Sequence, residues 1–332
     1  TATGAAGTLG GGGTVASGGA MTTGGNGGTP ATGGTGGSGG STALTPGGSG
    51  GTGGSAGGAG GQAQGGSGTG GGAGLPGAVP SMGCGTAATD TPEMFTLHNL
   101  TVLGHARSFF VRLPAGYDNT RAYPLTIMGP GCGGSGDMSI PIQNAAGPDA
   151  IVVGLNISAE VTGRDCFMTE SATSPELDYF DAMYAEVSAG YCIDTKRILY
   201  GGFSSGGWLA NLLGCARSNI LHVQGSSAGG LPPLPECPDP IAAIFFHDQP
   251  DNTNPLPGIE AARDRILTKN GCTGTDTMPW DPMFPDCQTY TGCPTAFPVV
   301  WCMTNNGSGH SPQDMLTAPA FWKLLMQLPP KP

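Results

Sequence analysis

The chain has 332 residues and a formal net charge of −11, and only 11% of its residues are charged. A negative charge of this size argues against a protein that binds nucleic acid or an anionic membrane surface, because both partners are polyanions. No apolar run approaches the ~20 residues that a membrane-spanning helix needs. No secretory signal sequence opens the chain, which predicts that it begins after processing or trimming.

The composition changes sharply near residue 84. Residues 1–83 contain no charged side chain and consist mostly of Gly, Ser, Thr and Ala. Such a segment cannot bury enough apolar surface to offset the entropy of ordering, which predicts a flexible tether over 1–83. Residues 84–332 carry every charge and are long enough for one domain with a full core.

All ten cysteines lie in the 84–332 segment, and none shows the C-x-x-C spacing of a structural zinc site. Their even number predicts disulfides and an oxidising compartment. The sequence leaves the pairing open, with Cys215 and Cys237 as one local possibility. A glycine-rich tether ahead of a cysteine-rich domain is typical of an exported protein held at a cell surface.

The first predicted elements are short strands at 94–97 and 107–113, the second of which is closed by Pro114. An apolar strand at 125–128 runs into the glycine-rich loop GPGCGGSGD. A further buried strand is predicted over 149–156.

A helix is predicted over 175–192, because apolar side chains recur there at steps of three and four residues after a Ser-Pro start. The stretch RILYGGFSSGGWLANLLGCAR follows. It predicts a strand at 197–200, a tight turn at 201–206 and a helix at 207–216.

The remaining predicted elements are strands at 221–224, 241–247 and 297–304 and helices at 258–272 and 311–328. Strands that alternate with helices, several of them apolar throughout, predict an α/β fold. Its mainly parallel sheet would be covered by helices on both faces. The two opening strands are expected to add an antiparallel edge.

The pattern Gly-x-Ser-x-Gly surrounds Ser204, and it also surrounds Ser38, Ser49, Ser55 and Ser227. Three of these serines lie in the predicted tether, where composition alone produces the pattern. Ser227 leads into LPPLPECP, which cannot form a helix, so it is interpreted as a strand-end loop. Only Ser204 stands between a strand and a helix. There the glycines permit a sharp turn and the helix directs its N–H groups at developing negative charge, which predicts a catalytic nucleophile.

A serine nucleophile of this kind requires an acid and then a histidine downstream. His98 and His105 precede the turn, while His222 and His247 fall in strand patterns where a buried imidazole is the usual outcome. His310 lies in a Gly-rich loop between the last strand and the last helix. We therefore predict His310 as the general base.

Two aspartates follow the strand at 241–247, and either Asp248 or Asp251 qualifies as the acid. We favour Asp251 because it lies farther into the loop, with room to turn back toward the base. A turn-forming or capping aspartate is the alternative for each. The oxyanion is expected to bind the amides of Ser205 and Cys132, with a plain glycine turn as the alternative for the second.

Three tryptophans are candidates for contact with substrate. Trp208, Trp280 and Trp301 could each line an acyl or sugar site, and core packing is the alternative for all three.

With these residues assigned, the domain resembles the secreted feruloyl esterases and polyhydroxybutyrate-depolymerase-like esterases of the α/β-hydrolase superfamily. The likeness runs from about residue 95 to residue 310. It rests on RSFFVRLPAGYDNTRAYPL, GCGGSGD, YCIDTKRILYGGFSSGG, EAARDRILTKNGC and VVWC…GH. It implies an α/β-hydrolase fold in which Ser204, Asp251 and His310 match the family's nucleophile, acid and base.

Two positions depart from the pattern of that family. Pro130 stands where the oxyanion loop usually has a histidine, and Asp248 stands where a glycine is common. Neither departure removes a catalytic group. Both are expected to alter loop geometry.

The sequence thus predicts a secreted or surface-tethered serine ester hydrolase that needs no metal or organic cofactor. The resemblance implies feruloyl or acetyl esters of plant cell-wall polysaccharide as substrates, with short polyesters such as polyhydroxybutyrate as the alternative. A catalytically silent binding or surface-structural module is the rival from another class. The expected partner is an ester substrate, without nucleic acid or a membrane span, and the tether would supply surface attachment.

Overall fold

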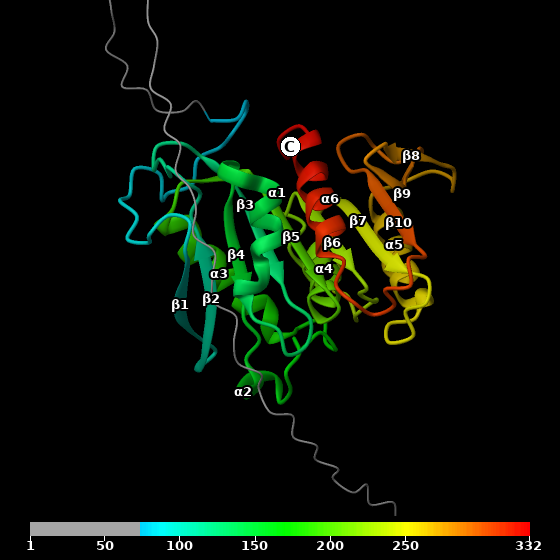
Figure 1. The fold of residues 1–332 in the computed structure, drawn as a ribbon, viewed down its shortest axis with the longest axis horizontal. Helices are drawn as coiled ribbons and strands as arrows, with labels where there is room; N and C mark the ends of the chain where they lie inside the picture. Colours follow the sequence, from blue (N-terminus) through cyan, green and yellow to red (C-terminus); the bar gives the residue numbers. More distant parts are fainter. Residues whose placement is uncertain (1–73) are drawn as a thin grey trace, which may run out of the picture. The chain divides into compact units, whose positions relative to one another are not determined.

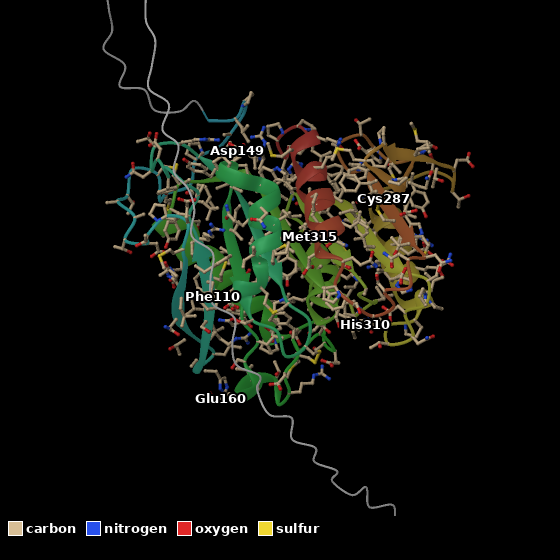
Figure 2. All side chains as sticks on the ribbon, viewed as in Figure 1. Phe110, Asp149, Glu160, Cys287, His310 and Met315 are labelled. Carbon is tan, nitrogen blue, oxygen red and sulfur yellow. A yellow bond between two sulfur atoms is a disulfide. The ribbon has the colours of Figure 1, made fainter. Side chains whose placement is uncertain are left out.

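The computed structural model describes residues 74–332, which are drawn in colour in Figure 1 and with their side chains in Figure 2. The predicted tether lies outside the described residues over 1–73. The domain organisation, with its boundary between 83 and 84, therefore stays a prediction.

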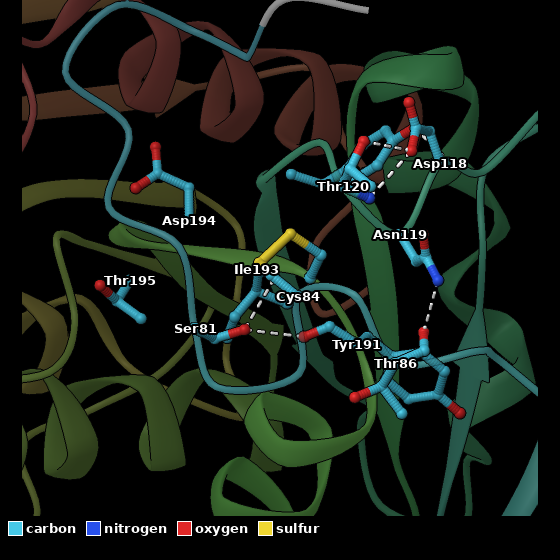
Figure 3. The surroundings of a disulfide bond; sticks show 12 residues. Ser81, Cys84, Thr86, Asp118, Asn119, Thr120, Tyr191, Ile193, Asp194 and Thr195 are labelled. Atoms are coloured by element: carbon cyan, nitrogen blue, oxygen red, sulfur yellow. Dashed lines mark hydrogen bonds between the residues drawn. A yellow bond between two sulfur atoms is a disulfide. The ribbon is translucent and has the colours of Figure 1, made fainter. Parts of the chain in front are cut away.

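The described residues just ahead of Cys84 lie against the domain (Figure 3). The Ser81 hydroxyl donates to the Tyr191 carbonyl at 2.7 Å and accepts from the Ile193 amide at 3.1 Å. Cys84 itself is disulfide-bonded to Cys192. Contacts with the domain thus begin before the first cysteine.

Within residues 74–332 the strands form one ten-stranded sheet in the order β1-β2-β4-β3-β5-β6-β7-β10-β9-β8. The six strands from β4 to β10 in that order pair in parallel, and the two strands at each edge pair antiparallel. The strands in chain order are β1 (Phe95–Val102), β2 (His105–Arg112), β3 (Tyr123–Gly129), β4 (Ile151–Leu155), β5 (Ile193–Phe203), β6 (Val223–Ser227), β7 (Ala242–Asp248), β8 (Thr277–Asp281), β9 (Phe284–Tyr290) and β10 (Val299–Thr304).

Helices cover both faces of this sheet (Figure 1). The α-helices are α1 (Ile140–Ala146), α2 (Ala159–Thr162), α3 (Pro175–Gly190), α4 (Ser205–Ala216), α5 (Leu256–Lys269) and α6 (Asp314–Gln327). Two single 3₁₀ turns, η1 (Gly136–Ser139) and η2 (Gly147–Asp149), flank α1.

Each face of the sheet has its own apolar core. The larger core takes Phe180 from α3, Leu212 from α4 and Ile259 from α5, all fully buried. The other core takes Ile142 from α1 and Phe321 from α6. Because successive side chains of a strand point to opposite faces, the continuously apolar central strands supply both cores at once.

The structure confirms the mainly parallel α/β sheet and the antiparallel edge at the start of the domain. It corrects several bounds. The strand predicted at 197–200 runs over the whole of β5, and α4 begins at Ser205 rather than 207 because the chain turns at a single residue. The strand predicted at 221–224 is displaced, since β6 begins at Val223.

Four further elements were not predicted, namely α1, α2 and the hairpin of β8 and β9. The two helices are short, at seven and four residues, and the hairpin strands carry Pro279 and Pro285, which suppress a strand prediction. The hairpin makes a second antiparallel edge beside β10.

All ten cysteines are paired, as the sequence predicts. Cys215–Cys237 is among the pairs. The disulfides are Cys84–Cys192, Cys132–Cys166, Cys215–Cys237, Cys272–Cys293 and Cys287–Cys302.

Candidate active site

Ser204 occupies the single residue between β5 and α4. Its backbone has φ 52° and ψ −115°, a left-handed conformation that is strained for a residue with a side chain. The turn is possible because Gly202 and Gly206 meet without side chains: a Cβ on Gly202 would lie 2.4 Å from the Gly206 carbonyl carbon. The serine oxygen therefore projects from the apex of a sharp strand-to-helix turn.

His310 and Asp251 lie in line with that serine. The Ser204 Oγ and the His310 Nε2 are 2.8 Å apart, and the His310 Nδ1 and the Asp251 Oδ2 are also 2.8 Å apart. An ionised carboxylate only accepts hydrogen bonds, so Nδ1 carries the proton and Nε2 accepts from the serine hydroxyl. This order of donors is the one that a general base needs.

The topology explains why residues so distant in sequence meet. Ser204 follows β5, Asp251 lies three residues beyond the end of β7, and His310 lies six residues beyond the end of β10. These strands are parallel members of one sheet, so their carboxyl ends open on the same edge. Figure 2 labels His310 at the end of the molecule where the chain enters α6.

The Asp251 carboxylate is fully buried and well supplied with donors. Burial raises its pKa, but the hydrogen bond with His310 and those from the amides of Asn254 and Thr253 outweigh burial and hold the pKa below its ordinary value. The two amides lie 3.0 and 2.9 Å from Oδ1. The group thus stays ionised and fixed beside the imidazole.

Asp248 has a different task. Its buried carboxylate accepts from the amide of Gly309 at 2.6 Å, from the amide of Asn306 at 3.1 Å and from the Thr304 hydroxyl at 2.8 Å. All three donors belong to the end of β10 and the loop that carries His310. Of the two aspartates that the sequence left open, Asp251 contacts the histidine and Asp248 holds its loop.

The two residues whose amides are expected to bind an oxyanion, Ser205 and Cys132, line the same cavity as Ser204. Within the described part of the chain, no residue accepts a hydrogen bond from the amide of Ser205 or of Cys132. The oxyanion loop, residues 129–135, is held against α4 because the Gly206 amide donates to the Pro130 carbonyl at 2.9 Å. Two such donors would suit a developing oxyanion if Ser204 is the nucleophile, as the sequence predicts.

A cavity of about 420 Å³ opens over these groups. Ser204, Ser205 and Cys132 form one part of its lining, and Trp208 and the buried Phe167 form an aromatic part. The other lining residues are Arg164, Cys166, Thr169, Glu170, Pro233, Thr253 and Asn254.

The chain is similar in sequence to several feruloyl esterases. It is 27% identical to feruloyl esterase D of Neurospora crassa over 257 residues, which are 70% of this chain and 83% of that protein. It is 24% identical to feruloyl esterase C of Emericella nidulans over 262 residues, which are 74% and 91% of the two chains. The chain is a homologue of the feruloyl esterases. No model of a protein family matches it.

Solved structures agree on the fold. The acetyl xylan esterase of Aspergillus awamori matches 65% of this chain and 94% of its own, with a TM-score of 0.51 and 12% sequence identity. The chain thus has the α/β-hydrolase fold. The similarity to the feruloyl esterases separately supports a carboxylic ester hydrolase. Among residues 74–332, no helix is both long enough and apolar enough to cross a membrane.

The three tryptophans that the sequence grouped together separate in the structure. Trp208 lines the cavity over Ser204. Trp280 instead stacks on Phe284 of the edge hairpin. The ring of Trp301 contacts that of Phe245, and the guanidinium of Arg263 lies 4.5 Å from the centroid of the Trp301 ring. Of the two possibilities left open by the sequence, these contacts favour packing for Trp280 and Trp301, and contact of Trp208 with substrate stays a prediction.

His222 and His247, the two histidines expected to be buried, are buried. His222 is 2% exposed, and burial, together with the nearby Lys331 and Arg197, lowers its pKa to about 4. His247 is 1% exposed, and burial lowers its pKa as well. Both imidazoles stay neutral near pH 7.

Two parts of the site could not be found from sequence. The role of Asp248 depends on the course of the loop after β10, and that of Cys166 depends on a disulfide whose pairing was open. The sequence offered one signal for the disulfide. Cys132 lies in the predicted oxyanion loop, so whichever cysteine pairs with it must also lie near that loop.

Proposed function

We propose that this chain is a serine ester hydrolase that works through an acyl-enzyme, with Ser204 as nucleophile, His310 as general base and Asp251 as the group that orients it. The observation that carries the proposal is the pair of 2.8 Å contacts that run from Ser204 through His310 to Asp251. The unsatisfied amides of Ser205 and Cys132 beside the serine support it.

The chemistry follows from these positions. The Ser204 oxygen bonds to the ester carbonyl carbon while His310 Nε2 takes the hydroxyl proton, and the two amides stabilise the negative oxygen that forms. The bond to the alcohol then breaks, and His310 gives its proton to the departing oxygen. A water molecule, deprotonated by His310, adds to the acyl carbon and releases the acid from Ser204.

The substrate class we propose is an aromatic acyl ester such as a feruloyl ester of plant cell-wall polysaccharide. Trp208 offers its ring to the cavity from the first turn of α4, close to the nucleophile. An indole stacks well on a planar aromatic group. The names of the homologues point the same way.

The ring of Trp208 is held by close contact with the backbone of Gly230. A Cβ at Gly230 would lie 2.3 Å from the indole, so any larger residue there displaces the ring. The Gly230 carbonyl is itself fixed by the Asn211 side chain at 2.8 Å. A fixed aromatic wall favours one acyl shape over others.

We also propose an extracytoplasmic location. Five disulfides in one domain persist only where the surroundings are oxidising. Attachment to a surface through residues 1–83 is part of the same proposal, although most of that segment lies outside the described residues.

The test of the reaction is hydrolysis of p-nitrophenyl acetate and methyl ferulate by the wild-type chain and by Ser204→Ala. We expect turnover of both esters by the wild type. The variant should lose about 10⁵- to 10⁶-fold in kcat, because the nucleophile is gone. A wild type that is inert on a panel of aryl, acetyl and hydroxybutyrate esters would support the catalytically silent module instead.

The test of the substrate class is Trp208→Ala, with Trp280→Ala as a matched control outside the cavity. We expect kcat/KM for methyl ferulate to fall about 10- to 100-fold and that for p-nitrophenyl acetate to fall less than about 3-fold. Gly230→Ala should shift the same ratio in the same direction. Equal losses on both esters would show that Trp208 does not select the acyl group.

A further inference from the structure

One short segment touches both residues that we propose as oxyanion donors. We define the clamp segment as residues 164–169. Its Cys166 is disulfide-bonded to Cys132, and its Phe167 amide donates to the Ser205 Oγ at 2.7 Å. The clamp segment thus bridges the two halves of the oxyanion hole, one by a covalent bond and the other by a hydrogen bond.

The oxyanion loop has few other restraints near Cys132. The Gly133 amide donates to the Asp165 carbonyl of the clamp segment at 2.6 Å, and the Gly134 amide closes a local turn on Gly131 at 3.0 Å. Gly133 has φ 74°, a conformation that glycine adopts readily because it has no Cβ. For the same reason glycine restricts the backbone of the loop less than other residues do. The disulfide is therefore the firmest link between this loop and the body of the domain.

The clamp segment itself is anchored in the core. Phe167 is 1% exposed, and the Met168 amide donates to Glu176 at 3.3 Å. Glu176 is fully buried and pairs with the buried Arg107, whose guanidinium lies 3.9 Å from the ring centroid of Tyr179. Because the clamp segment is fixed in this way, it can fix the positions of Cys132 and Ser205, to which it is bonded.

We propose that the Cys132–Cys166 disulfide is a positioning element of the oxyanion hole. It holds the Cys132 amide at a fixed place relative to the Ser205 amide, and its reduction lowers kcat while the domain stays folded. The inference rests on the proposed function, because it assigns a task within that active site.

The physical reason is the narrow geometry that an oxyanion donor must meet. A donor helps only when its nitrogen lies within about 2.7–3.1 Å of the developing oxygen, and loss of one donor costs about 10²- to 10³-fold in kcat. A loop freed from its disulfide still visits the productive position part of the time. The expected loss is therefore smaller, about 10- to 100-fold.

This disulfide is also the one most open to chemical attack. The Cys132 residue is exposed, whereas the other nine half-cystines, all within the described residues, are buried or half-buried. One thiolate of a dithiol attacks a sulfur of the disulfide and forms a mixed disulfide, and the second thiol then releases the two cysteine thiols as the dithiol is oxidised; access to the cysteine favours this attack. Mild reduction is thus expected to open Cys132–Cys166 before the others.

The test compares two double variants of the full chain. Cys132→Ala/Cys166→Ala removes this disulfide and keeps both backbone amides. Cys272→Ala/Cys293→Ala removes a half-buried disulfide that lies outside the cavity and serves as the matched control. Circular dichroism melts set an assay temperature well below both transitions.

We expect kcat and kcat/KM for p-nitrophenyl acetate to fall together by about 10- to 100-fold in the first variant, with KM nearly unchanged, because the lost interaction exists only in the transition state. A boronic acid, which forms a tetrahedral adduct on serine, should bind more weakly by the same factor. Affinity for the product acid should stay as in the wild type. The control variant should keep its kcat.

Wild-type protein provides the second measurement. After timed treatment with dithiothreitol and alkylation, loss of turnover should follow labelling of Cys132 and Cys166, and reoxidation should restore it. Full kcat in the first double variant, or full turnover in wild-type protein labelled at both cysteines, would overturn the proposal. The wild type must turn over ester before any comparison is made, so failure of the proposed function is seen separately.

Discussion

The two sides of Ser204 are built by different means. On one side, His310 is placed by two carboxylates, Asp251 at its ring and Asp248 beneath its loop. On the other side, Cys132 is placed by a disulfide and Ser205 by the amide of the buried Phe167. The side of the proposed base therefore depends on two aspartate side chains, and the side of the proposed oxyanion donors depends on the oxidation state of a cysteine pair.

The two kinds of support suit two different requirements of the proposed reaction. The imidazole must change its charge and its hydrogen bonds during the reaction, and carboxylates tolerate that change because they stabilise the charged ring. The oxyanion amides do not change charge and only need to stay in place. Fixed covalent support suits a group that must not move, and ionic support suits one whose charge alternates.

The largest effect expected on the base side is that of Asp251→Asn. The asparagine side chain carries no charge, and its amide group can donate to Nδ1. This donation favours the wrong imidazole tautomer and leaves the charged ring without its stabilising carboxylate, so kcat should fall about 10⁴-fold. Steady-state kinetics on p-nitrophenyl acetate measure it. Asp264→Asn, an exposed change on α5, is the control and should leave kcat as it is. A loss of less than about 10-fold for Asp251→Asn would contradict the role of Asp251 as the acid that orients His310.

Asp248→Asn should have a smaller effect on the same side. The change weakens the bonds to the amides of Gly309 and Asn306, so the His310 loop shifts without losing a reacting group. Displacements of this size cost about 10- to 100-fold. We expect kcat to fall on every ester tested, while the ranking of the esters by kcat stays as in the wild type. A loss as large as that of Asp251→Asn would make Asp248 the orienting acid instead.

The free energy of unfolding should fall in acid partly because Asp251 becomes protonated. Because the folded-state pKa of Asp251 lies below its unfolded value of about 3.9, its contribution to stability is present above that value and is lost as the pH falls through the folded pKa. Urea melts of the wild type between pH 6 and pH 3 should therefore show a steeper loss of unfolding free energy than melts of Asp251→Asn. Equal slopes would contradict the depressed pKa.

The smallest expected effect is the coupling between the sides. If they are independently built, Asp248→Asn combined with Cys132→Ala/Cys166→Ala should lose the product of the separate losses in kcat, to within about 2-fold. The triple variant and its parents are measured on one ester under one condition. A clear departure from the product would show that the His310 loop and the oxyanion loop move together.

Much of this site could be predicted from sequence, because its parts are tied to regular elements. The strand, the glycines and the helix around Ser204 are local, and the parallel sheet brings the ends of β7 and β10 to the same edge. The general course of the sheet follows from its apolar strands, such as AAIFFHD in β7.

The rest could not be predicted, since it depends on contacts without local signals. The pairing of Cys132 with Cys166 requires the path of the loop between β4 and α3. Trp208 can be distinguished from Trp280 and Trp301 only when the position of the edge hairpin is known. The prolines of that hairpin suppress the prediction of its strands. The start of α4 at Ser205 requires a left-handed residue, which propensity disfavours for serine.

The most direct test of the central claim is active-site labelling with a fluorophosphonate, followed by peptide mapping by mass spectrometry. The account predicts one phosphonyl group per chain, on Ser204, with loss of ester turnover in proportion to labelling and no label in Ser204→Ala. Turnover that survives full labelling of Ser204, or a label that settles on another serine and abolishes activity, would contradict it.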